Sequence, residues 1–133
     1  MKILIAEDDI TNRLVLESML APYGNVKSVI DGQEAVDAVT TALNGNDPYD
    51  LVCLDIMMPR KDGRSALREI REFEQNKGVL LGRGTKIVMT TCLSDSKNIL
   101  GSFGQQCDGY VVKPVEKTKL VGLLNELGLI PKK

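Results

Sequence analysis

The stretch LVCLDIMMPRKDG, residues 51–63, carries one carboxylate, Asp55, directly after an apolar run, and contains Pro59 and Gly63 beyond it. A charged side chain in an apolar segment costs free energy unless partners compensate for its burial. The run is unbroken rather than alternating, which is typical of a strand buried on both faces of a parallel sheet. We interpret it as a strand that ends at Asp55, whose partners are expected at the ends of other strands.

Short apolar runs and helical periodicities alternate along the rest of the chain. The expected strands are Lys2–Ala6, Val26–Ile30, Asp50–Leu54, Lys86–Thr90 and Gly109–Val112. The expected helices are Thr11–Ala21, a helix capped by Asp31 and ended by Gly45, Arg64–Glu74, Ser96–Gln106 and Glu116–Leu127. Five β-α units predict a parallel sheet covered by helices on both faces. The link over residues 76–85 is longer than most, and its apolar Val79–Leu81 either packs on the third helix or meets a partner.

The composition excludes several classes of function. The chain has 133 residues, which fits one domain, and a net charge of -1, which argues against non-specific nucleic-acid binding. It has no His, so any metal site would use oxygen ligands. Its three cysteines form neither a disulfide framework nor a zinc motif, and we expect them to be reduced. No signal peptide and no membrane-spanning run is recognisable, so a cytoplasmic location without membrane insertion is expected.

Polar residues follow four of the predicted strands. Glu7, Asp8 and Asp9 follow the first strand, Asp55 the third, Thr90 and Thr91 the end of the fourth, and Lys113 with Pro114 the fifth. Ligand sites of open parallel sheets lie outside the carboxyl ends of the strands, so these groups should meet at one edge.

The convergent groups suit phosphoryl chemistry. Asp8, Asp9 and Asp55 would repel one another, and Mg²⁺ bound by carboxylates and water would relieve that repulsion. A carboxylate can attack phosphorus to form an aspartyl phosphate. Lys113 would offset charge on the transferring group, and a threonine hydroxyl could bind a phosphoryl oxygen.

The motifs ILIAEDD, DLVCLDIMMPRKDG, KIVMTT and GYVVKP together resemble the receiver (CheY-like) domain of two-component response regulators along essentially the whole chain. The resemblance implies a flavodoxin-like (βα)5 fold, a doubly wound five-stranded parallel sheet with strand order 2-1-3-4-5. It implies that Asp55 accepts a phosphoryl group from a sensor histidine kinase or a histidine phosphotransfer protein, with Mg²⁺ as cofactor.

The resemblance also implies roles for individual residues. Asp8 and Asp9 are the acid pair, with Asp9 the direct metal ligand, and the carbonyl of Met57 is a further ligand. Lys113 contacts the phosphate, and its bond to Pro114 is expected to be cis. Pro59 and Gly63 shape the loop after the acceptor, Gly63 through a positive φ.

A switch is implied as well. Thr90 and Thr91 compete as its hydroxyl, and spacing from Lys113 favours Thr91; Tyr110 matches the switch aromatic. Phosphorylation would bias a surface made of the fourth helix, fifth strand and fifth helix, to which a downstream protein binds.

Two expectations go beyond the family pattern. Gly101 and Gly104 should make the fourth helix marginal, because each glycine costs roughly 0.8–1 kcal/mol against Ala. Apolar Met57 and Leu93 flank the acceptor and switch positions, which predicts slow self-dephosphorylation.

Two alternatives remain open. One is a Mg²⁺-dependent phosphohydrolase with an Asp nucleophile, although Met57 occupies the position where such enzymes usually carry a second Asp. The other is a binding module that works without phosphorylation. In the leading interpretation, residues 1–133 form a single receiver domain without an output domain. It is not an enzyme beyond its own phosphorylation and dephosphorylation, and it signals through proteins rather than nucleic acid.

Overall fold

The structure, a computed structural model, describes residues 1–80, 82–92 and 106–131. Its strands are β1 (Lys2–Ala6), β2 (Asn25–Val29), β3 (Leu51–Asp55), β4 (Lys86–Thr91) and β5 (Gly109–Val112). Its helices are α1 (Ile10–Leu20), the short 3-10 helix η1 (Ala21–Tyr23), α2 (Gly32–Asn44), α3 (Gly63–Asn76) and α5 (Lys117–Glu126). The predicted fourth helix, with Gly101 and Gly104, lies outside the described residues.

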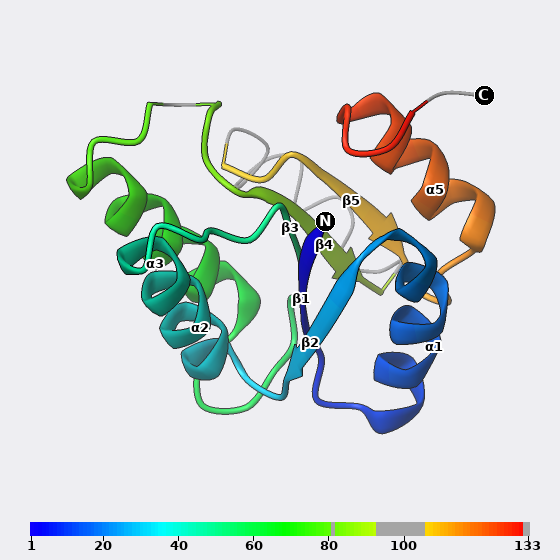
Figure 1. Cartoon of the computed structure of the whole chain (residues 1–133). Helices are drawn as coiled ribbons and strands as arrows, with labels where there is room; N and C mark the ends of the chain where they lie inside the picture. Colours follow the sequence, from blue (N-terminus) through cyan, green and yellow to red (C-terminus); the bar gives the residue numbers. More distant parts are fainter. Residues whose placement is uncertain (81, 93–105, 132–133) are drawn as a thin grey trace.

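The five strands form one parallel sheet in the order β2-β1-β3-β4-β5. This confirms the predicted fold class and strand order, and the bounds of the described strands and of α1, α2, α3 and α5 agree with the prediction to within one or two residues. Helices α2 and α3 lie on one face of the sheet, and α1 and α5 lie on the other (Figure 1). Within the described ranges, no helix is both long and apolar enough to cross a bilayer.

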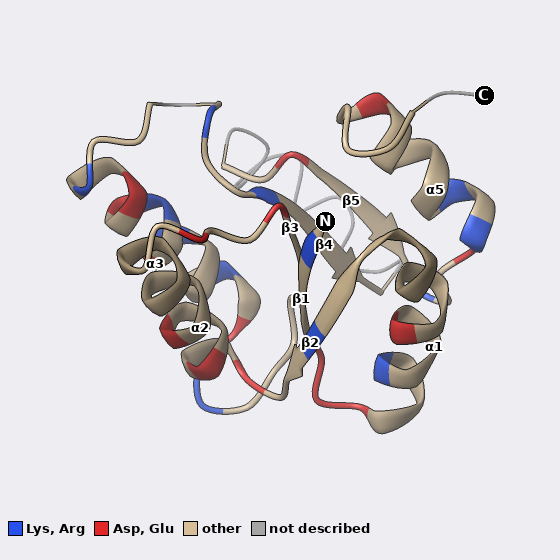
Figure 2. Cartoon of the chain, in the orientation of Figure 1, with Lys and Arg blue, Asp and Glu red and all other residues tan. Residues whose placement is uncertain are grey.

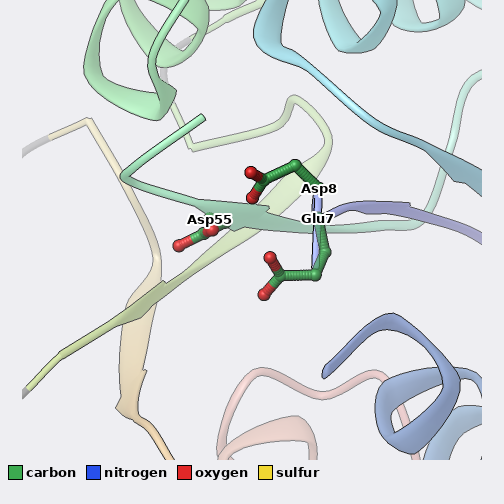
Figure 3. Close-up of side chains that lie close together, drawn as sticks. All are labelled: Glu7, Asp8 and Asp55. Atoms are coloured by element: carbon green, nitrogen blue, oxygen red, sulfur yellow. The ribbon is translucent and has the colours of Figure 1, made fainter. Parts of the chain in front are cut away.

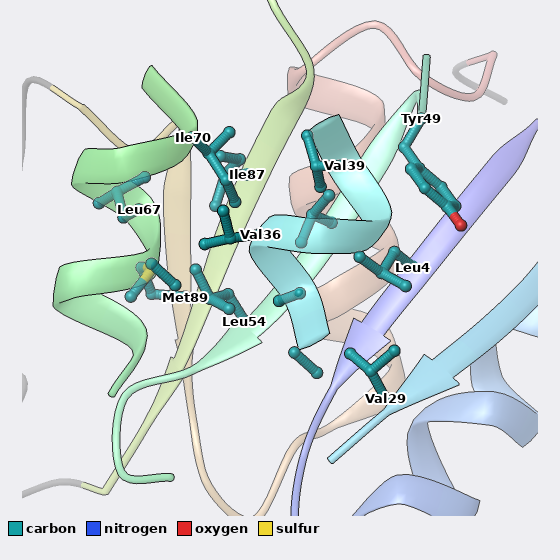
Figure 4. Packing of buried hydrophobic residues seen from close by; sticks show 14 of the residues in the cluster. Leu4, Val29, Val36, Val39, Tyr49, Leu54, Leu67, Ile70, Ile87 and Met89 are labelled. Atoms are coloured by element: carbon teal, nitrogen blue, oxygen red, sulfur yellow. The ribbon is translucent and has the colours of Figure 1, made fainter. Parts of the chain in front are cut away.

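Strand alternation divides the buried side chains between two cores. Val52 and Leu54 of β3 belong to the core under α2 and α3, which Figure 4 shows from close by. Leu51 and Cys53 of the same strand belong to the core under α1 and α5. A strand buried on both faces needs apolar residues at every position, which explains the unbroken run that precedes Asp55.

Aspartates begin three of the helices. Asp9 caps α1, Asp31 caps α2 and Asp62 caps α3, each by accepting a hydrogen bond from a backbone N–H in the first turn. Such caps satisfy N–H groups that have no partner inside the helix. The carboxylate of Asp9 is therefore engaged in capping α1, although Asp9 was also predicted to be a metal ligand.

A partly buried ionic network anchors the long link to the edge of the sheet opposite Asp55. The guanidinium of Arg71 donates to Glu74 Oε1 at 2.7 Å, to the carbonyl of Thr85 at 2.8 Å and to Asp108 Oδ2 at 2.9 Å. Glu74 Oε2 in turn accepts from the N–H of Thr85. In the predicted apolar cluster, Leu80 is exposed, and Leu81 lies outside the described residues. The network therefore positions one end of the link, while Leu80 faces solvent.

Charges of both signs are interspersed over the face of the molecule seen in Figure 2. The loop that follows β1 is acidic in that view. The distribution agrees with the net charge of -1. The electrostatics of the strand ends are therefore set by local clusters of charged residues, and not by an excess of one sign over this face of the molecule.

Candidate functional site

Three carboxylates meet at the carboxyl ends of β1 and β3. Carboxylate oxygens of Glu7, Asp8 and Asp55 lie within 4.8 Å of one another, in a cluster that could hold a metal ion. Figure 3 shows the three side chains converging from the two neighbouring strands. Glu7 and Asp55 are buried and Asp8 is exposed, so the cluster opens to solvent on one side. The sheet edge thus concentrates negative charge where the sequence predicted it.

Lys113 compensates part of this charge. Its Nζ lies 2.6 Å from Glu7 Oε1 and 3.1 Å from Asp55 Oδ1. Burial alone would lower the pKa of Lys113, but its bonds to Glu7 and Asp55 outweigh burial and raise the pKa above its ordinary value. The amine is therefore charged at neutral pH. The peptide bond between Lys113 and Pro114 is cis, as predicted.

Glu7 is a site residue to which the sequence analysis assigned no role. Burial raises its pKa, the hydrogen bond from Lys113 opposes that shift, and the neighbouring Asp55 carboxylate adds to it. The available signal was alternation: Ile5 and Cys53 share one face of the sheet, so Glu7 and Asp55 should share it too. Glu7, the acid immediately after β1, thus lies beside Asp55, the candidate nucleophile.

Asp9 does not join the cluster, and its predicted role as the direct metal ligand needs correction. Its carboxylate accepts a hydrogen bond from the N–H of Thr11 at 3.4 Å and caps α1, and the residue is exposed. Asp9 is the N-cap of α1, which begins at Ile10, so its carboxylate is engaged by the first turn of that helix. The acid pair that the structure brings to Asp55 is Glu7 and Asp8.

The loop after Asp55 is held close to the strand end. The N–H of Gly63 donates to the carbonyl of Ile56 at 2.8 Å, and a Cβ on Gly63 would collide with the carbonyl oxygen of Asp55. Glycine is therefore required here for close backbone approach. The predicted positive φ was wrong for Gly63: in this loop, positive φ occurs at Arg60, with a value of 65°.

Arg60 ties this loop to the start of α2. Its Nη1 lies 3.2 Å from Oδ2 of Asp31, the buried residue that caps α2 through the N–H of Glu34. The N–H of Gly32 also donates to the carbonyl of Lys61 at 2.9 Å. Two independent contacts therefore fix the acceptor loop against α2.

The two threonines of β4 face opposite sides of the sheet. Val88 packs in the α1–α5 core and Met89 in the α2–α3 core, so alternation directs Thr90 to the first side and Thr91 to the second. Tyr110 also packs against the α2–α3 core, on the same side as Thr91. The Thr91 hydroxyl donates to the carbonyl of Cys92 at 3.1 Å. This arrangement is compatible with Thr91 and Tyr110 as a switch pair and separates Thr90 from it.

Two further predicted positions have limited structural description. The side chain of Met57 is 66% exposed, so it projects to solvent beside the cluster. Leu93, its predicted counterpart, lies outside the described residues.

Comparisons with known proteins agree on one family. The model of the response regulator receiver domain matches residues 3–125. The chain is 32% identical over 127 residues to the osmosensing histidine protein kinase SLN1 of Saccharomyces cerevisiae, covering 94% of this chain and 10% of that protein. It is 30% identical to the transcriptional regulatory protein DltR of Streptococcus agalactiae, covering 91% of this chain and 49% of that protein. The chain thus spans half or less of the length of both relatives.

Solved structures show the same likeness. The receiver domain of the sensor histidine kinase PA1611 from Pseudomonas aeruginosa, which has a magnesium ion coordinated in its active-site cleft, is 31% identical, with a TM-score of 0.75 over 96% of this chain and 97% of that one. The receiver domain of Ssk1 from Saccharomyces cerevisiae was crystallised with the histidine phosphotransfer protein Ypd1. It is 26% identical to this chain, with a TM-score of 0.79, and the match covers 96% of this chain and 88% of that one.

Proposed function

Because the chain belongs to the response regulator receiver domain family, we propose that it is a phosphorelay receiver in which Asp55 accepts a phosphoryl group. The donor is the phosphohistidine of a sensor histidine kinase or of a histidine phosphotransfer protein. One observation carries the proposal: a carboxylate that is only 4% exposed ends a central strand, is bonded to Lys113, and lies among two further acids. Receiver domains are phospho-acceptors rather than turnover enzymes.

The residues account for the chemistry of transfer. A carboxylate oxygen of Asp55 attacks phosphorus, the bond from phosphorus to the histidine nitrogen breaks, and its electron pair returns to the imidazole. Lys113 supplies a fixed positive charge beside the oxygens of the transferring group. The same charge offsets the aspartyl phosphate that forms, which adds about -1.5 to -2 charge near neutral pH by analogy with other phosphorylated side chains.

The donor set of the cluster fits Mg²⁺. Three carboxylates and no nitrogen or sulfur ligand form a hard oxygen site, and Mg²⁺ typically binds one or two carboxylates, keeps waters and contacts phosphate. Asp8 and Asp55 would hold the ion, with Glu7 beside them and the Met57 carbonyl as a further ligand. When bound, the ion would offset negative charge on the carboxylates and on the phosphoryl group.

The downstream surface follows from the switch pair. Thr91 and Tyr110 lie on one side of the sheet, so a phosphoryl group that attracts the Thr91 hydroxyl leaves room for the Tyr110 ring to turn inward. The surface that responds comprises β5, α5 and the fourth helix predicted from the sequence, which lies outside the described residues, and it binds a downstream protein.

A protein donor also has a candidate contact surface. Ile10 and Leu14 of α1 are 59% and 55% exposed, and α1 begins directly after the acidic loop. Replacing both with Ser should slow phosphotransfer from a phosphotransfer protein and leave the reaction with acetyl phosphate unchanged. Equal slowing with both donors would contradict this assignment.

One experiment tests the proposed function against its alternatives. The chain is incubated with Mg²⁺ and acetyl phosphate, and its intact mass is measured beside that of Asp55→Asn. We expect a phosphoryl adduct on the wild type that the variant lacks. Release of phosphate without an adduct would favour a phosphohydrolase. Against that alternative, the residue two positions after Asp55 is the exposed Met57, which cannot act as a general acid, and the chain has no His. No reaction would favour a binding module.

A further inference from the structure

The buried hydroxyl of Thr90 has no assigned role. Thr90 is fully buried, and within the described part of the chain no group hydrogen-bonds its Oγ1. A valine of the same shape would fill this position without burying an unpaired polar atom. Buried polar groups in native structures are nearly always paired, so the unpaired hydroxyl points to a partner that it meets in another state of the site.

Strand register places Thr90 beside the phospho-acceptor. In the ladder between β3 and β4, Asp55 is paired with Thr90, and the N–H of Ile56 donates to the carbonyl of Thr90 at 3.2 Å. Paired residues of a parallel ladder point to the same face of the sheet. The preceding residues on that face, Cys53 and Val88, both pack in the α1–α5 core.

The lysine of the site passes over the same position. The sheet order places β4 between β3 and β5, so the side chain of Lys113, which follows β5, crosses the end of β4 to reach Asp55. Thr90 is the last residue of β4 on that face. An ammonium has three N–H donors, and Lys113 Nζ lies within ion-pair distance of two carboxylates, those of Glu7 and Asp55, so it can still donate to a neutral oxygen.

We propose that Thr90 is a positioning residue for phosphoryl transfer, whose hydroxyl accepts a hydrogen bond from the Lys113 ammonium when the site is phosphorylated. The inference rests on the proposed function of Asp55. When a phosphoryl group occupies Asp55, the amine exchanges its contact with the carboxylate for one with a phosphoryl oxygen. The Thr90 hydroxyl then holds the amine over β4, where Glu7 alone would draw it toward β1.

The test compares Thr90→Val, which removes only the hydroxyl, with Thr90→Ser, which retains it. Thr85→Val makes the same substitution at another buried threonine, just before the other end of β4. For each protein we measure the phosphorylation rate with acetyl phosphate, beryllofluoride binding in the presence of Mg²⁺, and the affinity for Mg²⁺ alone. Thermal unfolding shows whether each variant folds.

We expect Thr90→Val to lower the phosphorylation rate and beryllofluoride affinity about tenfold, the loss typical of one hydrogen bond to a charged group. Its Mg²⁺ affinity should stay within about twofold, because no carboxylate changes. Thr90→Ser should retain most of the rate, and Thr85→Val all of it. In a Lys113→Met background, Thr90→Val should have no further effect, because the hydroxyl acts through the lysine.

Three results would overturn the inference. Wild-type rates in Thr90→Val would remove any role for the hydroxyl. Equal losses in Thr90→Val and Thr90→Ser would assign the effect to packing. A full additional loss in the Lys113→Met background would show that Thr90 does not act through the lysine. A wild type that gains no phosphoryl group would instead overturn the proposed function itself, so the two failures are distinguishable.

Discussion

Lys113 and Glu7 form an ion pair across the carboxyl edge of the sheet, with 2.6 Å between Nζ and Oε1, although Glu7 is fully buried. Glu7 follows β1 and Lys113 follows β5, and β3 and β4 lie between these strands. The pair therefore spans the acceptor strand and compensates Glu7 and Asp55 with one cation. Because Lys113 pairs with both Glu7 and Asp55, the same contact affects the stability of the sheet edge and the chemistry of Asp55.

Removing this cation should destabilise the fold. Lys113→Met leaves Glu7 buried without its partner, and breaking a buried ion pair costs about 3 kcal/mol. We expect a loss of that order in urea unfolding at neutral pH without Mg²⁺. Adding Glu7→Gln to this variant should restore part of the loss, because it removes the uncompensated charge. A double variant no more stable than Lys113→Met would contradict this account.

The two neighbouring acids should differ in their effect on metal binding. Asp8→Asn removes a carboxylate from the cluster and should weaken Mg²⁺ binding at least about tenfold, because Mg²⁺ is bound through only one or two carboxylates. Asp9→Asn should change the affinity by less than about twofold, because Asn caps helices as well as Asp does. Mg²⁺ titration followed by calorimetry distinguishes the two. The opposite ranking would restore Asp9 as the direct ligand.

The contrast between these acids shows where sequence reasoning reached its limit. Unbroken apolar runs identified the strands, and their order along the chain identified the sheet edge. In the run Glu7-Asp8-Asp9, the choice of ligands depends on where β1 ends and on which residue begins α1. Alternation along β1 indicates Glu7, but helix capping separates Asp8 from Asp9, and three consecutive acids give no local signal for which of them is the cap.

The same reasoning applies elsewhere in the chain. The network of Arg71, Glu74 and Asp108 joins residues separated by up to 37 positions, so no motif indicated it. The requirement for Gly63 was recognised, but its cause was misassigned. A positive φ is a local property, whereas the observed cause is the approach of Gly63 to the Asp55 carbonyl in the folded chain.

Gly63 provides a test of that close approach. Gly63→Ala places a methyl group against the Asp55 carbonyl oxygen, and overpacking of this kind costs about 1–3 kcal/mol. Gly122→Ala in α5 meets no atom within 4 Å and should stabilise the protein by about 0.5–1 kcal/mol through helix propensity. Urea unfolding of both variants measures the contrast. If Gly63→Ala were as stable as the wild type, the loop would not be held as described.

The contact between Arg60 and Asp31 predicts unequal costs for its two partners. Arg60→Gly removes the cation beside the buried Asp31 carboxylate, but it also relieves a left-handed backbone that costs about 1 kcal/mol, so its net cost should be smaller than that of Asp31→Ala. Asp31→Ala loses the cap of α2, worth about 1 kcal/mol, and leaves Arg60 strained without its partner. Equal destabilisation by the two substitutions in chemical unfolding would contradict this assignment.

Cys53 and Cys92 should differ in reactivity. Cys53 is fully buried, and burial raises the pKa of its thiol to about 12, whereas Cys92 is exposed. We expect a thiol reagent at pH 8 to label Cys92 in the native protein and to label Cys53 only after unfolding, as peptide mass mapping would show. Native labelling of Cys53 at the rate of Cys92 would mean that the α1–α5 core opens readily.

The same thiol predicts a loss of stability at high pH. Because its folded pKa is raised from 9.0, the stability that Cys53 contributes is complete below pH 9 and is lost as pH rises toward 12. At pH 10.5 the loss is about 2 kcal/mol, from about 1.36 kcal/mol per pKa unit. Cys53→Ala should lack this component, while the titration of Lys and Tyr is common to both proteins and cancels. The difference in unfolding free energy between wild type and Cys53→Ala should therefore shrink from pH 8 to pH 10.5, and a constant difference would show that Cys53 is not held as a buried, protonated thiol.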